Sequence, residues 1–307
     1  MSFLDRIGAN ARWVMAGGCI AALFLPSLSA LLRPVLPALV SLVLAMAMAR
    51  IDLAEVARGA LRPARLGGWL LAVALMMPVA GGLLWLLGTL VPPRDQALLV
   101  LYAAAPPIAS AAGICFLMGY NAQRAVEVTV AATLLTPLIG PAMLAVLLPD
   151  LAPIPPATLA LRLAAMIAGG IVLALAIKAL VGPERIRTHA RRFDGIAACV
   201  MVLFVLPLFD GVGPMILAEP LTAAKVLALC LVINLGTTIA VLHLGRDRYT
   251  SGAYAVMAGN RTVALYLAAL PPDPYFGLFV ALYQFPMYLT PLALDTLGLH
   301  NRREAAT

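Results

Sequence analysis

The sequence predicts an all-α membrane protein that crosses the bilayer ten times, and three observations lead to this prediction. First, 63% of the 307 residues are hydrophobic and 11% are charged, whereas soluble domains have about a quarter charged residues. Second, the apolar residues form unbroken runs of roughly 20 residues rather than the alternating pattern of a membrane β-barrel. Third, arginines gather in every second loop between these runs, as they do in the cytoplasmic loops of helical membrane proteins.

Ten apolar runs are long enough to cross a bilayer core of about 30 Å, which needs roughly 20 helical residues. Arg33-Pro34 separates the first two runs, so we expect these two helices to form a tight hairpin. The first run also resembles a secretory signal peptide, but its removal would leave the second helix without a hairpin partner. The predicted spans are 12–32, 34–49, 66–91, 97–118, 125–148, 157–181, 196–217, 222–243, 251–271 and 276–298.

The loop arginines set the expected orientation. With the N-terminus in the cytoplasm, the outer loops carry only Arg33 and Arg94. The inner segments then carry Arg6, Arg12, Arg50, Arg58, Arg62, Arg65, Arg124, Arg185, Arg187, Arg191, Arg192, Arg246, Arg248, Arg302 and Arg303. The positive-inside rule therefore predicts cytoplasmic N- and C-termini. It also explains the net charge of +7 without a nucleic-acid partner, and the preference for Arg over Lys hints at a bacterial inner membrane.

Ten helices divide into two sets of five. Because five is an odd number, the second set starts on the opposite side of the membrane and is inverted relative to the first. Proline pairs recur at equivalent places, Pro137 and Pro141 in the fifth span and Pro286 and Pro291 in the tenth. This pattern is typical of transporters with inverted repeats, although prolines are also frequent in ordinary membrane helices. We expect repeats over residues 1–150 and 151–307, integrated in one membrane domain.

The fourth span contains a double proline, Pro106-Pro107, followed by the small residues Ala109 and Ser110. Two consecutive prolines remove two amide donors, so the helix must break near the middle of the bilayer. Freed carbonyls at this depth are tolerated where they line a cavity or meet protein donors. The break therefore predicts a binding site, and a kink without a role is the alternative.

The ninth span contains Asn260, Arg261 and Thr262, with Arg261 close to the bilayer midplane. An arginine at this depth costs about 2.5–3.5 kcal/mol on insertion scales, so it must face a cavity or an acidic partner. Because arginine keeps its proton, the position holds a permanent cation. It predicts either a site for a substrate anion or a structural ion pair. Glu127 in the fifth span is the candidate counter-ion, and a local pair with Arg124 is its alternative.

The remaining polar groups of the spans give weaker signals. Asp210 and Asn234 are either packing contacts or cavity-lining groups, and Arg162, Lys178, Lys225 and Asp295 lie near helix ends, where their side chains can reach the interface. The four cysteines lie inside apolar runs as small core residues, and the histidines lie in or beside loops. We find no enzyme motif and expect neither a metal nor a cofactor.

Several of these residues together resemble the bile acid:sodium symporter family. The resemblance rests on Ala105-Pro106 with the small-residue break after it, Asn121, Thr129, Thr133–Leu138, Pro141 and the Gly259-Asn260 pair of the ninth span. It implies two inverted five-helix repeats, with a core of helices 3–5 and 8–10 against a panel of helices 1, 2, 6 and 7. It also implies transport of organic anions by alternating access, with the substrate bound where broken helices 4 and 9 cross.

The sodium ligands of that family are largely missing from this chain. The positions that correspond to them are Val73, Ala111, Ala112, Ala125, Thr129, Ala255 and Gly259. Among these seven positions, only Thr129 has a side chain with an oxygen atom. A sodium ion needs several oxygen ligands. We therefore expect Arg261 to act as a fixed cation that bridges carbonyls at the helix 4 break in place of a mobile ion.

The sequence accordingly predicts a secondary transporter or facilitator of a small organic anion that is not coupled to sodium through these positions. Pro106, Pro107, Ala109, Ser110, Asn260, Arg261 and Thr262 are the predicted substrate-binding residues. The alternative is a membrane sensor or binding scaffold that keeps the fold without transport. An enzyme is not expected, because no catalytic constellation is present.

Overall fold

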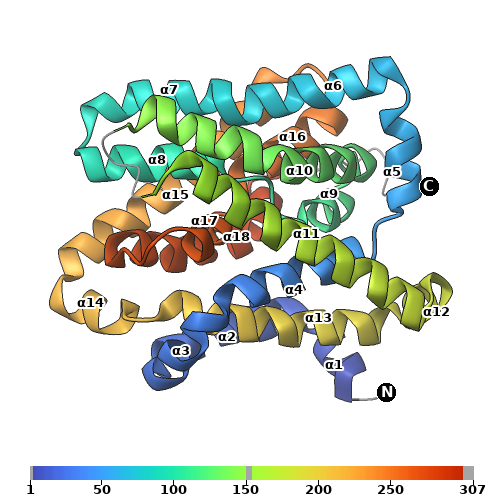
Figure 1. Ribbon diagram of the computed structural model, residues 1–307, viewed down its shortest axis with the longest axis horizontal. Helices are drawn as coiled ribbons and strands as arrows, with labels where there is room; N and C mark the ends of the chain where they lie inside the picture. The colour runs from blue at the N-terminus through green and yellow to red at the C-terminus, as the bar shows by residue number, and fades with distance from the viewer. Residues whose placement is uncertain (1–2, 150–153, 300–307) are drawn as a thin grey trace.

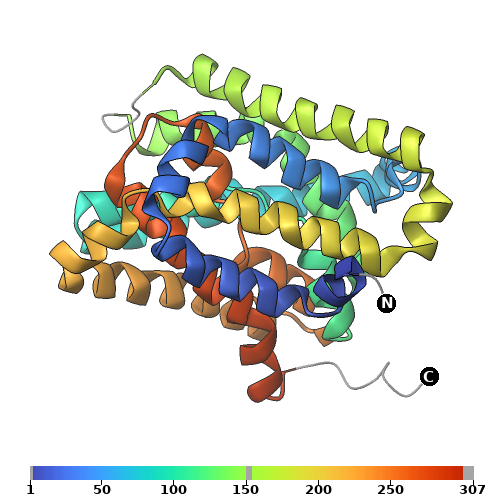
Figure 2. The same ribbon diagram turned by 90° about the horizontal axis from the view of Figure 1, so that it is seen from below.

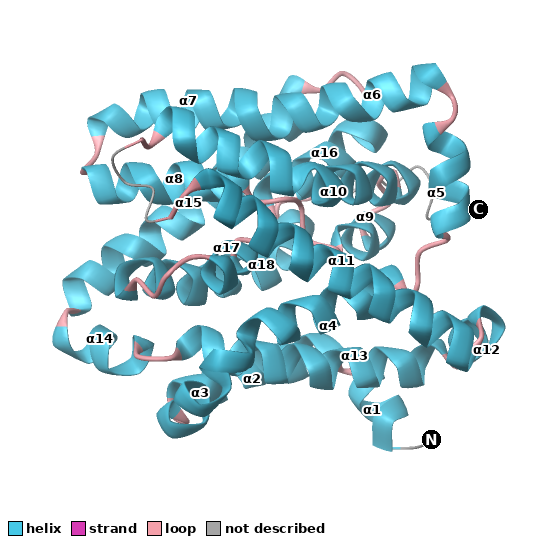
Figure 3. Cartoon of the chain, viewed as in Figure 1, coloured by secondary structure: helices cyan, strands magenta, loops and turns pink. Residues whose placement is uncertain are grey.

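The computed structural model describes residues 3–149 and 154–299, which form helices connected by short loops (Figure 3). The helices up to the gap are α1 (Phe3–Ala9), α2 (Ala11–Leu23), α3 (Pro26–Leu32), η1 (Arg33–Val35), α4 (Leu36–Met48), α5 (Leu53–Ala60), α6 (Pro63–Ala74), η2 (Leu75–Val79), α7 (Ala80–Leu87), η3 (Gly88–Leu90), α8 (Pro93–Ala104), α9 (Ala111–Leu117) and α10 (Ala122–Leu147). The later helices are α11 (Pro156–Val181), α12 (Pro183–Thr188), α13 (Ala190–Val205), η4 (Leu206–Phe209), α14 (Val212–Ala218), α15 (Pro220–Leu244), α16 (Arg248–Gly259), α17 (Ala264–Ala269) and α18 (Pro274–Thr296).

Local sequence signals explain where the helices begin. Proline occupies the first position of α6, α8, α11, α15 and α18, where its missing N–H has no partner to lose. Side chains of Asp52, Asn121, Asp247 and Asp273 accept hydrogen bonds from first-turn amides of α5, α10, α16 and α18. These caps satisfy donors that a helix start leaves free.

Within the described residues, seven helices are long and apolar enough to cross a membrane. They cover Pro26–Met48, Pro63–Leu90, Ala122–Leu147, Pro156–Val181, Ala190–Phe209, Pro220–Leu244 and Pro274–Thr296. The chain is therefore an all-α protein with the composition of a multi-pass membrane protein. Large apolar side chains also lie on the outer faces of these helices, such as Leu83, Leu138 and Val172, which are 58%, 70% and 64% exposed. Such faces fit lipid rather than water.

Four of the ten predicted spans consist of shorter helices. The run 12–32 divides into α2 and α3, the run 97–118 into α8 and α9, the run 196–217 into α13 with η4 and α14, and the run 251–271 into α16 and α17. The expected turn at Arg33-Pro34 is wrong: the chain leaves the helical state at Phe24 and Leu25, and the span Pro26–Met48, formed by α3, η1 and α4, runs through Arg33 and Pro34. The ten-span count and the inverted repeats stay predictions.

The helices pack in two groups that contact each other along one side (Figure 1). In the α4 group, α13 lies between α2 and α4, and α11 packs along α4 (Figure 2). In the α10 group, α10 contacts α6, α8, α9 and α16, while α15 packs between α16 and α18. The groups meet where α11 contacts α10 and where α17 contacts α4 and α11. Helix α5 links the groups at one end of the molecule, and α14 links them at the other (Figure 1).

Close packing of α4 against α11 holds the α4 group together. A Cβ atom on Gly170 of α11 would lie 2.9 Å from Cβ of Leu44 and 3.1 Å from the carbonyl oxygen of Ser41. The Ser41 hydroxyl donates a hydrogen bond to the carbonyl of Met166 at 2.9 Å. A small residue at position 170 thus lets the two helix backbones approach each other, as in other membrane helix pairs.

We expect Gly170→Ala to destabilise the protein by about 1–3 kcal/mol, since the added methyl overpacks the α4–α11 contact. The matched control is Gly82→Ala in α7, where an added Cβ meets no atom within 4 Å. Thermal unfolding of both purified variants in the same detergent measures the difference. A Gly170→Ala variant as stable as Gly82→Ala would contradict the close approach.

Candidate functional site

The candidate site lies where two helices of the α10 group are interrupted. Helix α8 ends at Ala104, and the chain is extended at Ala105 before Pro106 and Pro107. Helix α16 ends at Gly259, and Asn260 is extended in turn. Since neither proline has an amide donor, α8 cannot continue through them. Both predicted helix breaks are therefore present in the structure.

The two extended segments pair with each other. Pro107 and Arg261 form an isolated antiparallel bridge. The Ile108 amide donates to the Asn260 carbonyl at 2.9 Å, and the Thr262 amide donates to the Pro106 carbonyl at 2.8 Å. The Thr262 hydroxyl donates to the Pro107 carbonyl at 3.2 Å. The breaks thus supply each other with hydrogen-bond partners that water cannot provide inside a membrane.

The guanidinium of Arg261 joins the ends of two helices to the middle of a third. Its Nε atom donates to the Ala258 carbonyl at 3.0 Å, its Nη1 atom to the Ala105 carbonyl at 3.2 Å, and its Nη2 atom to the Met76 carbonyl at 2.7 Å. The first two carbonyls lie at the C-terminal ends of α16 and α8, where a helix carries partial negative charge. The third lies in η2, a π-helical turn that contains Pro78.

Two tyrosines complete the surroundings of Arg261. The Tyr102 ring centroid lies 5.9 Å from Cζ of Arg261, within the range of a cation–π contact. The Tyr102 hydroxyl donates to the Ala258 carbonyl at 2.7 Å. The Tyr283 hydroxyl accepts the Arg261 amide at 2.9 Å and donates to the Gly259 carbonyl. Aromatic rings and carbonyl oxygens therefore surround a side chain that is 3% exposed.

A second polar cluster fixes Asn260 beside Arg261. The Asn260 amide group donates to the Val256 carbonyl at 2.9 Å. Its side-chain oxygen lies 3.1 Å from the Thr290 hydroxyl and 3.4 Å from Nδ2 of Asn234. Asn234 also donates to the Gly259 carbonyl. All three side chains are buried, so this cluster connects α15, α16 and α18 behind the crossing.

Glu127, the candidate counter-ion of Arg261, lies elsewhere. Its carboxylate accepts hydrogen bonds from Nη2 of Arg65 at 2.9 Å and from Nε1 of Trp69 at 2.8 Å. The alternative local pair is present, with Nη1 of Arg124 at 3.8 Å. Within the described residues, no carboxylate forms an ion pair with Arg261, and carbonyl oxygens take that place. The physical reason is that interrupted helices already present carbonyls with partial negative charge.

The crossing has one buried face and one accessible face. Asn260, Arg261, Pro106 and Pro107 are buried, whereas Ala109 and Thr262 are partly exposed and Ser110 is exposed. The predicted substrate-binding residues therefore lie together, but a ligand outside this closed arrangement can touch only the accessible ones.

The positions that the resemblance aligns with sodium ligands are mostly buried. Val73, Ala111, Ala125 and Ala255 are buried and apolar, and Ala112 is partly buried. The Thr129 hydroxyl is buried without a hydrogen-bond partner among the described groups. At Gly259, an added Cβ would lie 1.8 Å from the Thr238 hydroxyl oxygen, so the helices α15 and α16 leave no room for a longer ligand-bearing side chain there. The described residues hold no cluster of three or more His, Cys, Asp or Glu groups.

Sequence reasoning missed four groups that shape the site: the carbonyl of Met76 and the hydroxyls of Tyr102, Tyr283 and Tyr266. The Tyr266 hydroxyl donates to the Ala104 carbonyl at 2.9 Å and so fastens α17 to the end of α8. A tyrosine inside an apolar run is a weak signal, because its ring packs like any other large side chain. The carbonyl of Met76 carries no sequence signal apart from the nearby Pro78.

Comparison with models of known protein families gives no match to this chain, and comparison with curated protein sequences gives none either.

We expect Arg261→Gln to lower the thermal stability of the purified protein strongly. The shorter amide cannot reach the three carbonyls, and each buried polar group without a partner costs about 1–3 kcal/mol. Arg261→Lys should lose less stability, because it keeps the charge and can reach one of these acceptors.

Glu127→Gln is the control that separates the two buried charge clusters. Because Glu127 contacts Arg65 and Trp69 instead of Arg261, its effect should add to that of Arg261→Gln in the double variant. Non-additive stability changes would instead indicate a coupled ion pair. An Arg261→Gln protein as stable as the wild type would refute the bridging role.

Proposed function

We propose that this protein is a secondary transporter or facilitator of a small organic anion that works by alternating access. The observation that carries the proposal is the buried charge of Arg261 at the crossing of two broken helices. Carbonyl oxygens solvate this charge, but they do not neutralise it. In a medium of low dielectric constant, the remaining positive potential extends to the accessible face with Ser110 and Thr262. An anion is the ligand that this potential favours.

The interrupted helices themselves support transport over a purely structural role. Non-helical backbone at membrane depth is tolerated where it is buried in protein or lines a cavity, and transporters place their substrates on such breaks. The pairs α8/α9 and α16/α17 occupy the fourth place in each set of five predicted spans. The prolines of α10 and α18 occupy the fifth place in each set. This recurrence supports an inverted-repeat architecture with ten spans.

The two helix groups supply the moving parts of the proposed mechanism. The crossing belongs to the α10 group, and the α4 group faces it from one side (Figure 1). We assign them the roles of transport core and supporting panel that the symporter resemblance implies. Displacement of one group along the other then exposes the crossing to one side of the membrane at a time.

Arg261 also accounts for a transport cycle without sodium. A bound cation that holds broken helix ends together must be supplied from solution, whereas a guanidinium is covalently attached and always charged. The carbonyls of Ala105, Ala258 and Met76 would otherwise need such a cation or other donors. We therefore infer that Arg261 replaces the coupling ion and that the electrochemical gradient of the substrate drives net transport.

The proposed location is a bacterial inner membrane with both termini in the cytoplasm. In the structure α1, α5 and α12 lie toward one end of the molecule, while α3 and α14 lie toward the other (Figures 1 and 2). The helices at the first end carry Arg6, Arg58, Arg185 and Arg187, which are all assigned to the cytoplasm, in agreement with the positive-inside rule.

Uptake of labelled monocarboxylates into proteoliposomes tests the proposed function. We expect saturable uptake above that of protein-free vesicles, with a rate that is nearly unchanged when potassium or choline replaces sodium. Arg261→Lys should reduce uptake, and Lys225→Gln is the control for removal of a basic residue elsewhere. Anion binding without uptake would favour the sensor or scaffold instead. A steep dependence on sodium would contradict the fixed-cation mechanism.

Reporter fusions test the orientation independently of any substrate. A fluorescent protein fused to either terminus should fold in the cytoplasm and fluoresce, while alkaline phosphatase fused after Leu148 should be active outside it. A C-terminal tail on the opposite side from the N-terminus would contradict an even number of spans.

A further inference from the structure

One arginine outside the crossing connects the two helix groups. Arg162 lies in the second turn of α11, which belongs to the α4 group. Its Nη1 atom donates a hydrogen bond of 2.8 Å to the carbonyl oxygen of Ala269. Ala269 is the last residue of α17, which belongs to the α10 group. The hydrogen bonds described above at the crossing and between α4 and α11 each lie within one group, whereas this one spans the boundary.

The partner of Arg162 is a carbonyl at a helix end. The last carbonyls of a helix have no partner within it, and they carry the negative end of the helix dipole. A cationic donor from a neighbouring helix is therefore a favourable partner. The bond is nevertheless exchangeable, because Arg162 itself is an exposed residue and its guanidinium N–H groups can donate to a new ligand instead.

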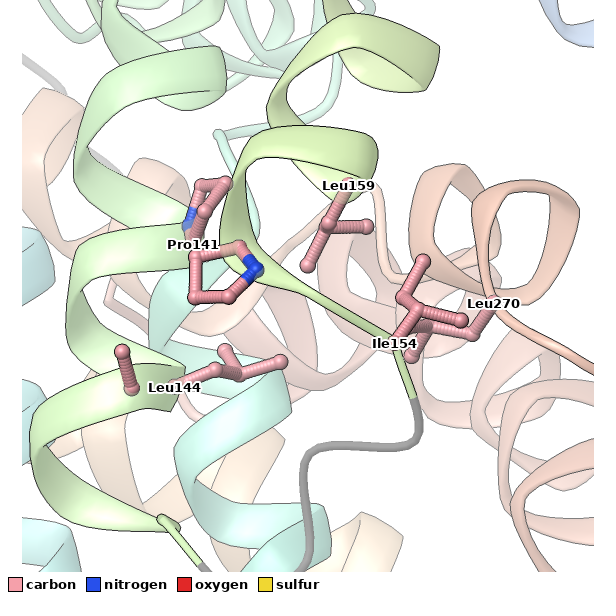
Figure 4. Close-up of a pocket in the computed structure, with 7 residues that line it drawn as sticks. Pro141, Leu144, Ile154, Leu159 and Leu270 are labelled. Atoms are coloured by element: carbon pink, nitrogen blue, oxygen red, sulfur yellow. The ribbon is translucent and has the colours of Figure 1, made fainter.

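An apolar contact lies directly beside this hydrogen bond. Figure 4 shows a small hollow with Pro141 and Leu144 of α10, Leu159 of α11, and Ile154 and Leu270 around it. Ala145 and Pro156 also line it. Leu159 lies one turn before Arg162, and Leu270 directly follows Ala269. The hollow has only apolar lining residues, so it seals the boundary between the groups without attracting a charged ligand.

Helix α17 joins this seal to the crossing. It has six residues and is about 9 Å long at 1.5 Å per residue. Arg261 and Thr262 lie directly before it, and Ala269 is at its far end. Tyr266 fastens it to Ala104 at the end of α8. A displacement of α17 relative to α11 therefore opens the seal and moves the accessible face of the crossing at the same time.

We propose that Arg162 is a gate residue at the outer end of the boundary, and that an organic anion opens this gate by binding to its guanidinium. A carboxylate accepts two parallel charge-assisted hydrogen bonds from arginine, which a neutral carbonyl cannot match. Binding of the anion thus releases Ala269 and favours the open arrangement, because the anion has higher affinity for the freed arginine. The inference rests on the proposed transport of anions, but its test does not require transport.

The test measures access to a buried position in the seal. Leu159 is 2% exposed, so Leu159→Cys should react slowly with a hydrophilic maleimide while the gate is closed. The background carries Cys199→Ser, since Cys199 is the exposed cysteine whereas Cys19, Cys115 and Cys230 are buried. Arg162→Gln should raise the labelling rate about tenfold, which corresponds to the loss of one hydrogen bond with a charged donor. Arg162→Lys should stay closer to the wild-type rate.

The matched control is Arg94→Gln. Arg94 is an arginine of the predicted outer side that stacks on the Tyr275 ring at 5.8 Å, so its contact lies within the α10 group. Its removal should leave the labelling of Leu159→Cys unchanged. If Arg162→Gln leaves the maleimide labelling rate of Leu159→Cys at the value of the parent protein, Arg162 is not a gate residue.

The second arm tests release by an anion. Benzoate should raise the labelling rate of the parent protein in detergent, and it should have no further effect in Arg162→Gln. Benzyl alcohol, its neutral counterpart, should leave the parent rate unchanged. A parent rate that does not respond to benzoate would overturn opening by anions. If Arg162→Gln and benzoate both raise the labelling rate but proteoliposomes show no uptake, the proposed transport function is wrong and the gating role of Arg162 is supported.

Discussion

One guanidinium determines how the centre of this protein is built. Breaking a membrane helix leaves carbonyl oxygens without donors, and the two breaks here, with the π-helical turn at Met76, present such carbonyls to a single point. Arg261 satisfies three of them at once, and no other side chain offers five donors in a planar arrangement. The crossing of α8/α9 and α16/α17 depends on this contact. The tyrosines around it add hydroxyl donors to the carbonyls of Ala258 and Gly259.

The sequence predicted those parts of the site that follow from a residue's own chemistry. Pro106-Pro107 breaks a helix wherever it stands, and an arginine at midplane depth must be buried with partners. The identity of those partners depends on how distant segments meet, which explains the error about Glu127. Trp69 and Arg65 lie on α6, far from Glu127 in the chain but next to it in space. Likewise, Arg162 was interpreted as a side chain that reaches the interface, because its acceptor on α17 lies 107 residues away.

The helix count shows the same limit for the fold. Hydropathy identified every apolar run, since burial in lipid is a property of local composition. It could not show that four of those runs consist of shorter helices, because a break contributes little to an average over about 20 residues. The grouping around α4 and α10 depends on close contacts such as Gly170 against Leu44, and these contacts are set by shape rather than by hydropathy.

A charge that is covalently part of the protein has an electrical consequence. In a symporter the coupling cation accompanies the anionic substrate, so the two charges partly cancel as they cross the field. In the proposed transport cycle, Arg261 replaces that cation but stays in the protein, so a monoanion would cross the membrane with its own charge uncompensated. Each 100 mV of membrane potential would then contribute about 2.3 kcal/mol to the complete cycle. A voltage that is negative inside drives the anion outward, so the energised membrane itself would bias such a carrier toward export.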